Sequence, residues 1–151
     1  MKTLFLDRDG IINIDTGYVH KIEDFVWADG IFDFLRSAVR SGFQIFVVTN
    51  QSGIGRGYYT EADFHILTQF MLGVLKQEGI PIRHVFYSPY HPEAAIETYR
   101  IDHETRKPKP GMFYAARERY GIDLSRAVMV GDRDSDAIAA YSAKIPHIAI
   151  V

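Results

Sequence analysis

The sequence predicts an α/β fold in which a mainly parallel, five-stranded sheet lies between layers of helices. Short apolar runs alternate along the chain with longer amphipathic stretches, which is typical of repeated strand–helix–strand units. Gly42, Gly79 and Gly121 stand one or two residues after three of the amphipathic stretches, where glycine commonly ends a helix. Because crossovers between parallel strands are right-handed, all strands should end at the same edge of the sheet.

The strands are expected in five apolar runs, at residues 3–6, 44–48, 85–87, 127–130 and 147–150. The helices between them are expected at residues 31–40, 61–77, 111–120 and 135–142. Asp29 and Thr60 precede the first two helices and suit N-caps, and Pro110 suits the first turn of the third.

Two connections, residues 13–27 and 89–109, are long for a small domain, and such loops are usually functional or disordered. The first contains the turn residues Asp15 and Gly17 followed by Tyr18, an aromatic side chain suited to covering a site. The second is rich in proline, histidine and charge, and we expect it to be a lid or specificity loop within one domain spanning residues 1–151. An irregular surface loop is the alternative.

Length and composition indicate one globular domain. The chain has 151 residues, of which 47% are hydrophobic and 24% charged, and its formal charge of −2 argues against a nucleic-acid partner. No apolar stretch reaches the roughly 18–20 residues that span a membrane, and no secretory signal is visible. The absence of cysteine excludes disulfides and thiolate chemistry and fits a reducing compartment. We therefore expect a cytoplasmic protein, monomeric, with no membrane partner.

The most informative segment is the first strand, which ends in Asp7, Arg8, Asp9 and Gly10. Side chains two residues apart on an extended chain point the same way, so the two carboxylates should lie close together. Like charges at short range destabilise each other unless a cation or a shared proton relieves them. The pair therefore predicts a Mg²⁺ site, or one ionised nucleophile beside one proton carrier. An ordinary Asp-Gly turn is the alternative.

Three further segments should reach the same edge of the sheet. Residues 49–57 combine a hydroxyl, an amide and three glycines, which suit phosphate oxygens. Residues 106–111 bring three cations to a helix start, and residues 131–136 bring three acids that could cap a helix or bind Mg²⁺. Each segment alone also suits a turn, a solvated loop or a cap. Together they predict phosphoryl transfer, which needs an in-line nucleophile and neutralised oxygens.

The motifs DRDG, TN, Lys-Pro and GDRDSD resemble, in order and spacing, those of the haloacid dehalogenase (HAD) superfamily. Residues 15–20, 49–54 and 106–112 are more narrowly similar to its histidinol-phosphatase/heptose-bisphosphatase branch. The similarity spans nearly the whole chain. It implies a HAD-like, Rossmann-like three-layer sandwich with a minimal cap.

The resemblance also implies roles for single residues. Asp7 would be the nucleophile that forms an aspartyl-phosphate, and Asp9 the general acid and base. Mg²⁺ would be held by the Asp7 carboxylate, the Asp9 backbone carbonyl and Asp132. Thr49 and Asn50 would bind the transferring phosphoryl group, while Lys107 balances its charge. The full set of implied substrate-binding residues is Asp15, Gly17, Tyr18, Thr49, Asn50, Gln51, Ser52, Arg106, Lys107 and Arg133.

Three features depart from the branch: residue 11, residue 133 and the ligand positions of a zinc site. Ile11 replaces the usual Thr after the two aspartates, which leaves the carboxylates in place. Arg133 replaces a Lys, so a planar guanidinium stands where the branch has the point charge of an ammonium group. The branch commonly holds a structural zinc through three Cys and one His in the loop after the third strand. The matching positions here are Ser88, Tyr90, His103 and Thr105. Because a structural zinc needs four N/S ligands, we expect none.

The expected activity is therefore that of a Mg²⁺-dependent phosphomonoesterase acting on a small sugar phosphate, preferably the 7-phosphate of a heptose 1,7-bisphosphate. Histidinol phosphate is the nearest alternative substrate, but the basic set Arg106, Lys107 and Arg133 suits a second phosphate better than a cationic amine. A nucleic-acid 3′-phosphatase conflicts with the charge balance. An inactive binding or scaffold homologue is the alternative outside enzymes.

Overall fold

Five parallel strands form one sheet in the order β3-β2-β1-β4-β5, in a computed structural model that describes all 151 residues. The strands are β1 (Lys2–Leu6), β2 (Phe43–Asn50), β3 (His84–Ser88), β4 (Ala127–Gly131) and β5 (His147–Ile150). All five expected strands are confirmed, and the first four are longer than the apolar runs alone indicate. For β2 the reason is pairing: Asn50 lies opposite Ser88, so the ladder continues through a polar residue.

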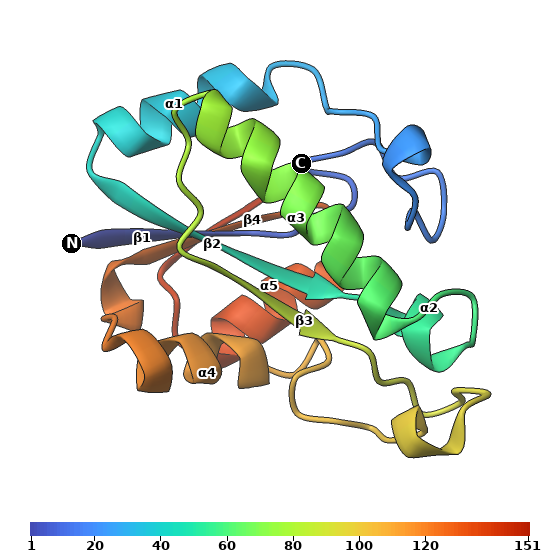
Figure 1. Cartoon of the computed structure of the whole chain (residues 1–151). Coiled ribbons are helices and arrows are strands. Elements are labelled where there is room, and N and C mark those ends of the chain that lie inside the picture. The colour runs from blue at the N-terminus through green and yellow to red at the C-terminus, as the bar shows by residue number, and fades with distance from the viewer.

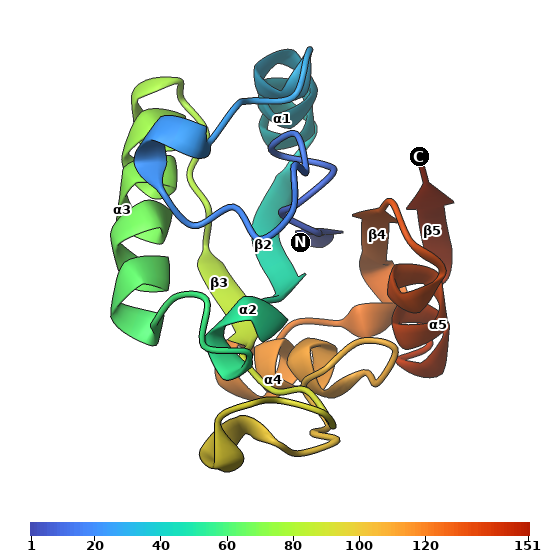
Figure 2. The same ribbon diagram turned by 90° about the vertical axis from the view of Figure 1, so that its right-hand side faces the viewer.

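Helices cover both faces of the sheet and make it the middle of three layers (Figures 1 and 2). The helices α1 (Ile31–Arg40) and α3 (Glu61–Gln77) pack on one face, and α4 (Gly111–Tyr120) and α5 (Asp134–Ser142) pack on the other. Neighbouring strand residues face opposite layers, as the period of a strand requires. Leu4 and Leu6 therefore join the core under α1 and α3, whereas Phe5 joins the core under α4 and α5.

The helix starts bear out one of the two expected caps. Thr60 accepts a hydrogen bond from the Asp63 N–H and forms a capping box at α3. The prediction that Asp29 caps α1 is wrong, because Gly30 is the residue before the helix and has a left-handed φ of 76°, so no side chain caps α1. Pro110 lies one position before α4 instead of in its first turn.

Four short helical turns were not predicted: Ile22–Asp24, α2 (Ser52–Gly55), Glu97–Tyr99 and Leu124–Arg126. The turn α2 lies within the glycine-rich segment 49–57, which was expected to bind phosphate, and gives two of its glycines a packing role. A Cβ at Gly53 would overlap the ring of Tyr59, and a Cβ at Gly55 would press on the Pro89 carbonyl oxygen. These two glycines therefore permit close packing around the short helix.

The topology places a crevice beside Asp7. The chain runs outward from β1 through β2 to β3, and then returns to the other side of β1 for β4 and β5. Ligands of open α/β sheets bind at such a switch point, outside the carboxyl ends of the strands. None of the helices combines the length and apolar character of a membrane-spanning segment.

Candidate active site

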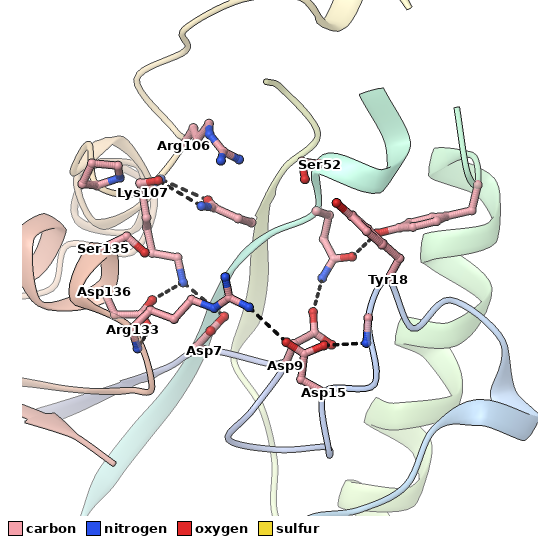
Figure 3. Close-up of a pocket in the computed structure, with 15 residues that line it drawn as sticks. Asp7, Asp9, Asp15, Tyr18, Ser52, Arg106, Lys107, Arg133, Ser135 and Asp136 are labelled. Carbon is pink, nitrogen blue, oxygen red and sulfur yellow. Dashed lines mark hydrogen bonds and ion pairs between the residues drawn. The ribbon is translucent and has the colours of Figure 1, made fainter. Parts of the chain in front are cut away.

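A cavity of about 380 Å³ opens at this switch point (Figure 3). It contains all the site residues expected from the sequence except Thr49 and Asp132, and adds Tyr59, Pro108, Ser135 and Asp136. Most of its lining is polar; the lining residues are Asp7, Asp9, Asp15, Gly17, Tyr18, Asn50, Gln51, Ser52, Tyr59, Arg106, Lys107, Pro108, Arg133, Ser135 and Asp136.

Asp7 is the first residue after β1, and its carboxylate lies at the floor of the cavity. Its Oδ1 accepts the Arg8 backbone N–H at 2.9 Å and lies 3.1 Å from Lys107 Nζ. Burial raises the pKa of Asp7 to about 7, with Asp136 and Asp9 adding to the rise and Lys107 opposing it. The fold therefore holds a carboxylate where its charge is costly, which is typical of a functional group.

Lys107 provides the buried positive charge of the site, with 3% of the residue exposed. Its ammonium group lies 3.1 Å from Asp7, lies 2.5 Å from Asp136, and donates to the Val48 carbonyl at 2.9 Å. Burial acts to lower its pKa, but Asp7 and Asp136 outweigh burial and the pKa of Lys107 is raised. The ammonium group therefore stays charged beside the nucleophile candidate.

Asn50 fixes the backbone of this lysine. Its side-chain amide donates to the Lys107 carbonyl at 3.0 Å and accepts the Lys107 N–H at 3.0 Å. Asn50 borders the cavity, but both ends of its amide are engaged in this pair. The neighbouring Thr49 is fully buried and accepts a hydrogen bond from Gln51 at 2.9 Å. Binding of the phosphoryl group by Thr49 and Asn50 stays a prediction.

Asp136 is a site residue that the sequence reading missed. It lies in the first turn of α5, is 1% exposed, and accepts the backbone N–H groups of Asp132 and Arg133 at 3.1 and 3.2 Å. Its other oxygen contacts Lys107. Asp136 thus joins the loop after β4 to the buried lysine. The signal was present in the sequence, because an acid three residues after the N-cap of a helix can accept the backbone N–H of that N-cap, here Arg133.

Three carboxylates, those of Asp7, Asp132 and Asp136, offer oxygens that all lie within 4.8 Å of one another. Asp132 Oδ1 is buried without a hydrogen-bond partner, and burial raises the pKa of Asp132. A side chain at Gly10 would overlap the Asp132 carboxylate, so the glycine keeps this space open. Clustered carboxylate oxygens are the ligands that Mg²⁺ prefers. Since Asp136 is already fully hydrogen-bonded, Asp7 and Asp132 are the side chains that fit the metal.

Asp9 lies on the opposite wall, within a dense set of donors. Its Oδ1 accepts from Arg8 Nε at 3.1 Å, Arg8 Nη2 at 2.8 Å and Asn13 Nδ2 at 3.0 Å. Its Oδ2 accepts from Gln51 Nε2 at 3.1 Å. Arg8 is 2% exposed and also donates to the Val19 carbonyl, so it ties the following loop to the site. Asp7 and Asp9 therefore occupy different environments despite their spacing.

The rim of the cavity is positively charged. Arg106 is partly buried and makes no side-chain hydrogen bond or ion pair within the chain; burial, and then Arg56, lower its pKa. Arg133 lies 3.2 Å from Asp15 and so joins the start of α5 to the loop after β1 across the cavity mouth. The Arg106 guanidinium makes no hydrogen bond and has Arg56 nearby, so it is suited to an anionic ligand, although Asp102 opposes the lowering of its pKa.

The four positions that match the zinc ligands of the branch lie together and contact one another. The rings of Tyr90 and His103 stack with centroids 4.1 Å apart. The Thr105 hydroxyl lies 3.0 Å from the Ser88 hydroxyl and 2.8 Å from His103 Nδ1, which also accepts the Thr105 N–H. One histidine with an engaged nitrogen, two hydroxyls and a phenol do not form a zinc site.

A buried carboxylate beside a buried lysine, with a cluster of three carboxylates at the end of a parallel sheet, is the arrangement expected of a HAD-like phosphatase. A family model described as HAD-hydrolase-like matches residues 104–150. A D-glycero-alpha-D-manno-heptose-1,7-bisphosphate 7-phosphatase from Burkholderia mallei is 49% identical over 144 residues, 95% of this chain and 76% of that protein. The corresponding beta-anomer enzyme of Escherichia coli strain CFT073 is 45% identical, over 94% of this chain and 75% of that protein.

The crystal structure of a D,D-heptose 1,7-bisphosphate phosphatase from B. bronchiseptica, in complex with magnesium and phosphate, is also similar. It superposes with a TM-score of 0.83 at 30% identity, covering 95% of this chain and 76% of that chain. The chain therefore belongs to the family of the HAD-superfamily heptose-1,7-bisphosphate 7-phosphatases.

Proposed function

We propose that the protein hydrolyses the 7-phosphate of D-glycero-D-manno-heptose 1,7-bisphosphate through an aspartyl-phosphate on Asp7. The observation that carries the proposal is the buried Asp7 carboxylate, 3.1 Å from Lys107 and within 4.8 Å of Asp132. Relatives that are 45–49% identical to this chain over the aligned regions carry this activity in their names.

In the first step, an Asp7 carboxylate oxygen attacks phosphorus and the bond to the sugar oxygen breaks. The hydrogen bonds to Asp7 fall on Oδ1, which leaves Oδ2 as the attacking oxygen. Asp9 gives its proton to the departing alkoxide, so that the sugar leaves as a neutral alcohol. Lys107 neutralises charge on Asp7 before attack and on the phosphoryl oxygens afterwards.

In the second step, water attacks the phosphorus of the aspartyl-phosphate. The ionised Asp9 takes the proton from that water, the bond between Asp7 and phosphorus breaks, and inorganic phosphate leaves. Asp7 and Asp132, together with the Asp9 backbone carbonyl, would hold Mg²⁺, which when bound supplies positive charge to the phosphoryl oxygens.

The second phosphate of the substrate is proposed to bind at the basic rim. Arg106 has no partner within the chain, and Arg133 is bound only by Asp15 through one contact of 3.2 Å. A phosphate dianion would replace this weak surface pair with charge-assisted hydrogen bonds. Residues 89–109 follow β3 beside this rim, and we propose that they act as a lid that selects the sugar. Because residues 89–109 form only a small lid, we also propose that the protein is a monomer.

The test is a comparison of Mg²⁺-dependent phosphate release from four substrates: the two anomers of heptose 1,7-bisphosphate, a heptose monophosphate and histidinol phosphate. We expect the highest kcat/KM on one of the bisphosphate anomers. Faster hydrolysis of histidinol phosphate would assign the other substrate of the branch. No release from any ester with Mg²⁺ present would refute the enzyme assignment.

A further inference from the structure

The hydrogen bonds of Gln51 give this residue a role different from contact with the sugar. The side chain is 2% exposed, and its two amide protons go to Asp9 Oδ2 at 3.1 Å and Thr49 Oγ1 at 2.9 Å. Its carbonyl oxygen accepts the Tyr59 hydroxyl at 2.5 Å. Both N–H donors of the Gln51 amide are therefore used within the protein, and one of them is bound to Asp9, the proposed acid and base.

The orientation of the amide has a clear physical cause. A carboxylate accepts hydrogen bonds but does not donate them, so the NH₂ end of Gln51 must face Asp9 while Asp9 is ionised. When Asp9 carries its proton, this constraint weakens, and the Tyr59 hydroxyl keeps the amide in place by donating to its oxygen. Burial raises the pKa of Tyr59, which keeps the hydroxyl a donor.

Tyr59 is itself held firmly. The residue is 6% exposed, and its ring stacks on His20 with centroids 4.8 Å apart and an interplanar angle of 8°. Gly53 leaves the space that the ring needs, since a Cβ there would overlap it. The ring is therefore fixed by packing, and its hydroxyl is free to orient Gln51.

The two oxygens of Asp9 differ because of these contacts. Oδ1 accepts three hydrogen bonds, from Arg8 and Asn13, and has little capacity left for a proton. Oδ2 accepts one, from Gln51, and keeps a free lone pair. We propose that Gln51 and Tyr59 are positioning residues that hold Asp9 Oδ2 as the oxygen that carries the transferable proton. This inference rests on the proposed role of Asp9 in phosphate-ester hydrolysis.

The experiment compares kcat/KM on two esters that differ in their need for an acid. A sugar phosphate releases an alkoxide and needs the proton of Asp9, whereas p-nitrophenyl phosphate releases a stable phenolate and does not. The ratio kcat/KM includes steps only up to departure of the leaving group. It therefore isolates the first chemical step from hydrolysis of the aspartyl-phosphate.

Tyr59→Phe should lower kcat/KM on the sugar phosphate by about fivefold and on p-nitrophenyl phosphate by less than about twofold, since one hydrogen bond is lost. Gln51→Leu should give a larger selective loss, of about 30-fold, because acid catalysis contributes 10²–10⁴-fold in all. The double variant should be no worse than Gln51→Leu alone, since Tyr59 acts through Gln51. Tyr141→Phe, at an exposed position, is the matched control.

Equal losses on both esters, or no loss on either, would overturn the positioning role. Additive losses in the double variant would also overturn it, because they indicate separate structural effects. Tyr59→Phe keeps the ring that fills the space beside Gly53, so this variant decides the question even if Gln51→Leu does not fold. A wild-type protein inactive on both esters would refute the proposed function itself, and with it this inference.

Discussion

Replacing Lys107 with methionine should destabilise the protein strongly and in a pH-dependent way. The substitution keeps the length of the side chain but removes the ammonium group that lies 3.1 Å from Asp7 and 2.5 Å from Asp136. Two carboxylates that are 7% and 1% exposed then have no cation beside them. Removing one partner of a buried ion pair costs about 3–5 kcal/mol. We expect a loss near the lower value at pH 6.

The loss should increase above pH 7. The pKa of Asp7 is about 7 in the folded protein and 3.8 without the fold's influence, so the folded state binds this proton more tightly than the unfolded state. The stability of the wild-type protein therefore falls as pH rises towards 7 and then levels off. Lys107 lowers the pKa of Asp7, so removing Lys107 raises that pKa. In the variant, Asp7 of the folded protein therefore stays protonated to higher pH, and the free energy of unfolding goes on falling above pH 7.

This continued loss amounts to about 1.4 kcal/mol for each pH unit, or about 2 kcal/mol between pH 7 and pH 8.5. Urea unfolding at pH 6 and pH 8.5, with EDTA present, measures both quantities, and Trp27 is a convenient fluorescent probe. Lys109→Met is the matched control, because Lys109 is 43% exposed and pairs with an exposed Asp102. It should change stability by less than about 0.5 kcal/mol at either pH. A loss in Lys107→Met under about 1 kcal/mol, or one independent of pH, would refute the reasoning.

Three further predictions concern the chemistry. Asp7→Asn should abolish phosphate release. The melting temperature of this variant at pH 8 should stay at or above that of the wild type, because burial disfavours the negative charge that the substitution removes. Residual turnover would exclude Asp7 as nucleophile. Arg106→Ala should raise KM for the heptose bisphosphate by about tenfold and change a monophosphate little, with the exposed Arg126→Ala as control; equal effects on both substrates would argue against a second-phosphate site. A zinc-selective chelator should shift the melting temperature by less than about 1 °C, whereas EDTA should stop hydrolysis until Mg²⁺ is restored; a large shift with the zinc chelator would contradict the metal-free loop.

The sequence alone was sufficient for the sheet, the main helices and the location of the site. Apolar runs and helical periodicity are local properties, so all five strands were predicted, and the bounds of β5 were predicted as observed, whereas the other four strands extend further than expected. Parallel strands end at one edge, so residues as distant as Asp7, Gln51, Lys107 and Arg133 could be expected in one cavity. The motifs then assigned the chemistry through resemblance.

Only the tertiary structure decided which contacts each of these residues makes within the site. Asn50 and Lys107 are 57 residues apart, and no local pattern indicates that the amide of one holds the backbone of the other. Gln51 lines the cavity as expected, yet its hydrogen bonds go to Asp9, Thr49 and Tyr59. The physical reason is that local sequence determines which residues reach the sheet edge, whereas the hydrogen-bond partner of each side chain depends on which distant segments the fold brings beside it.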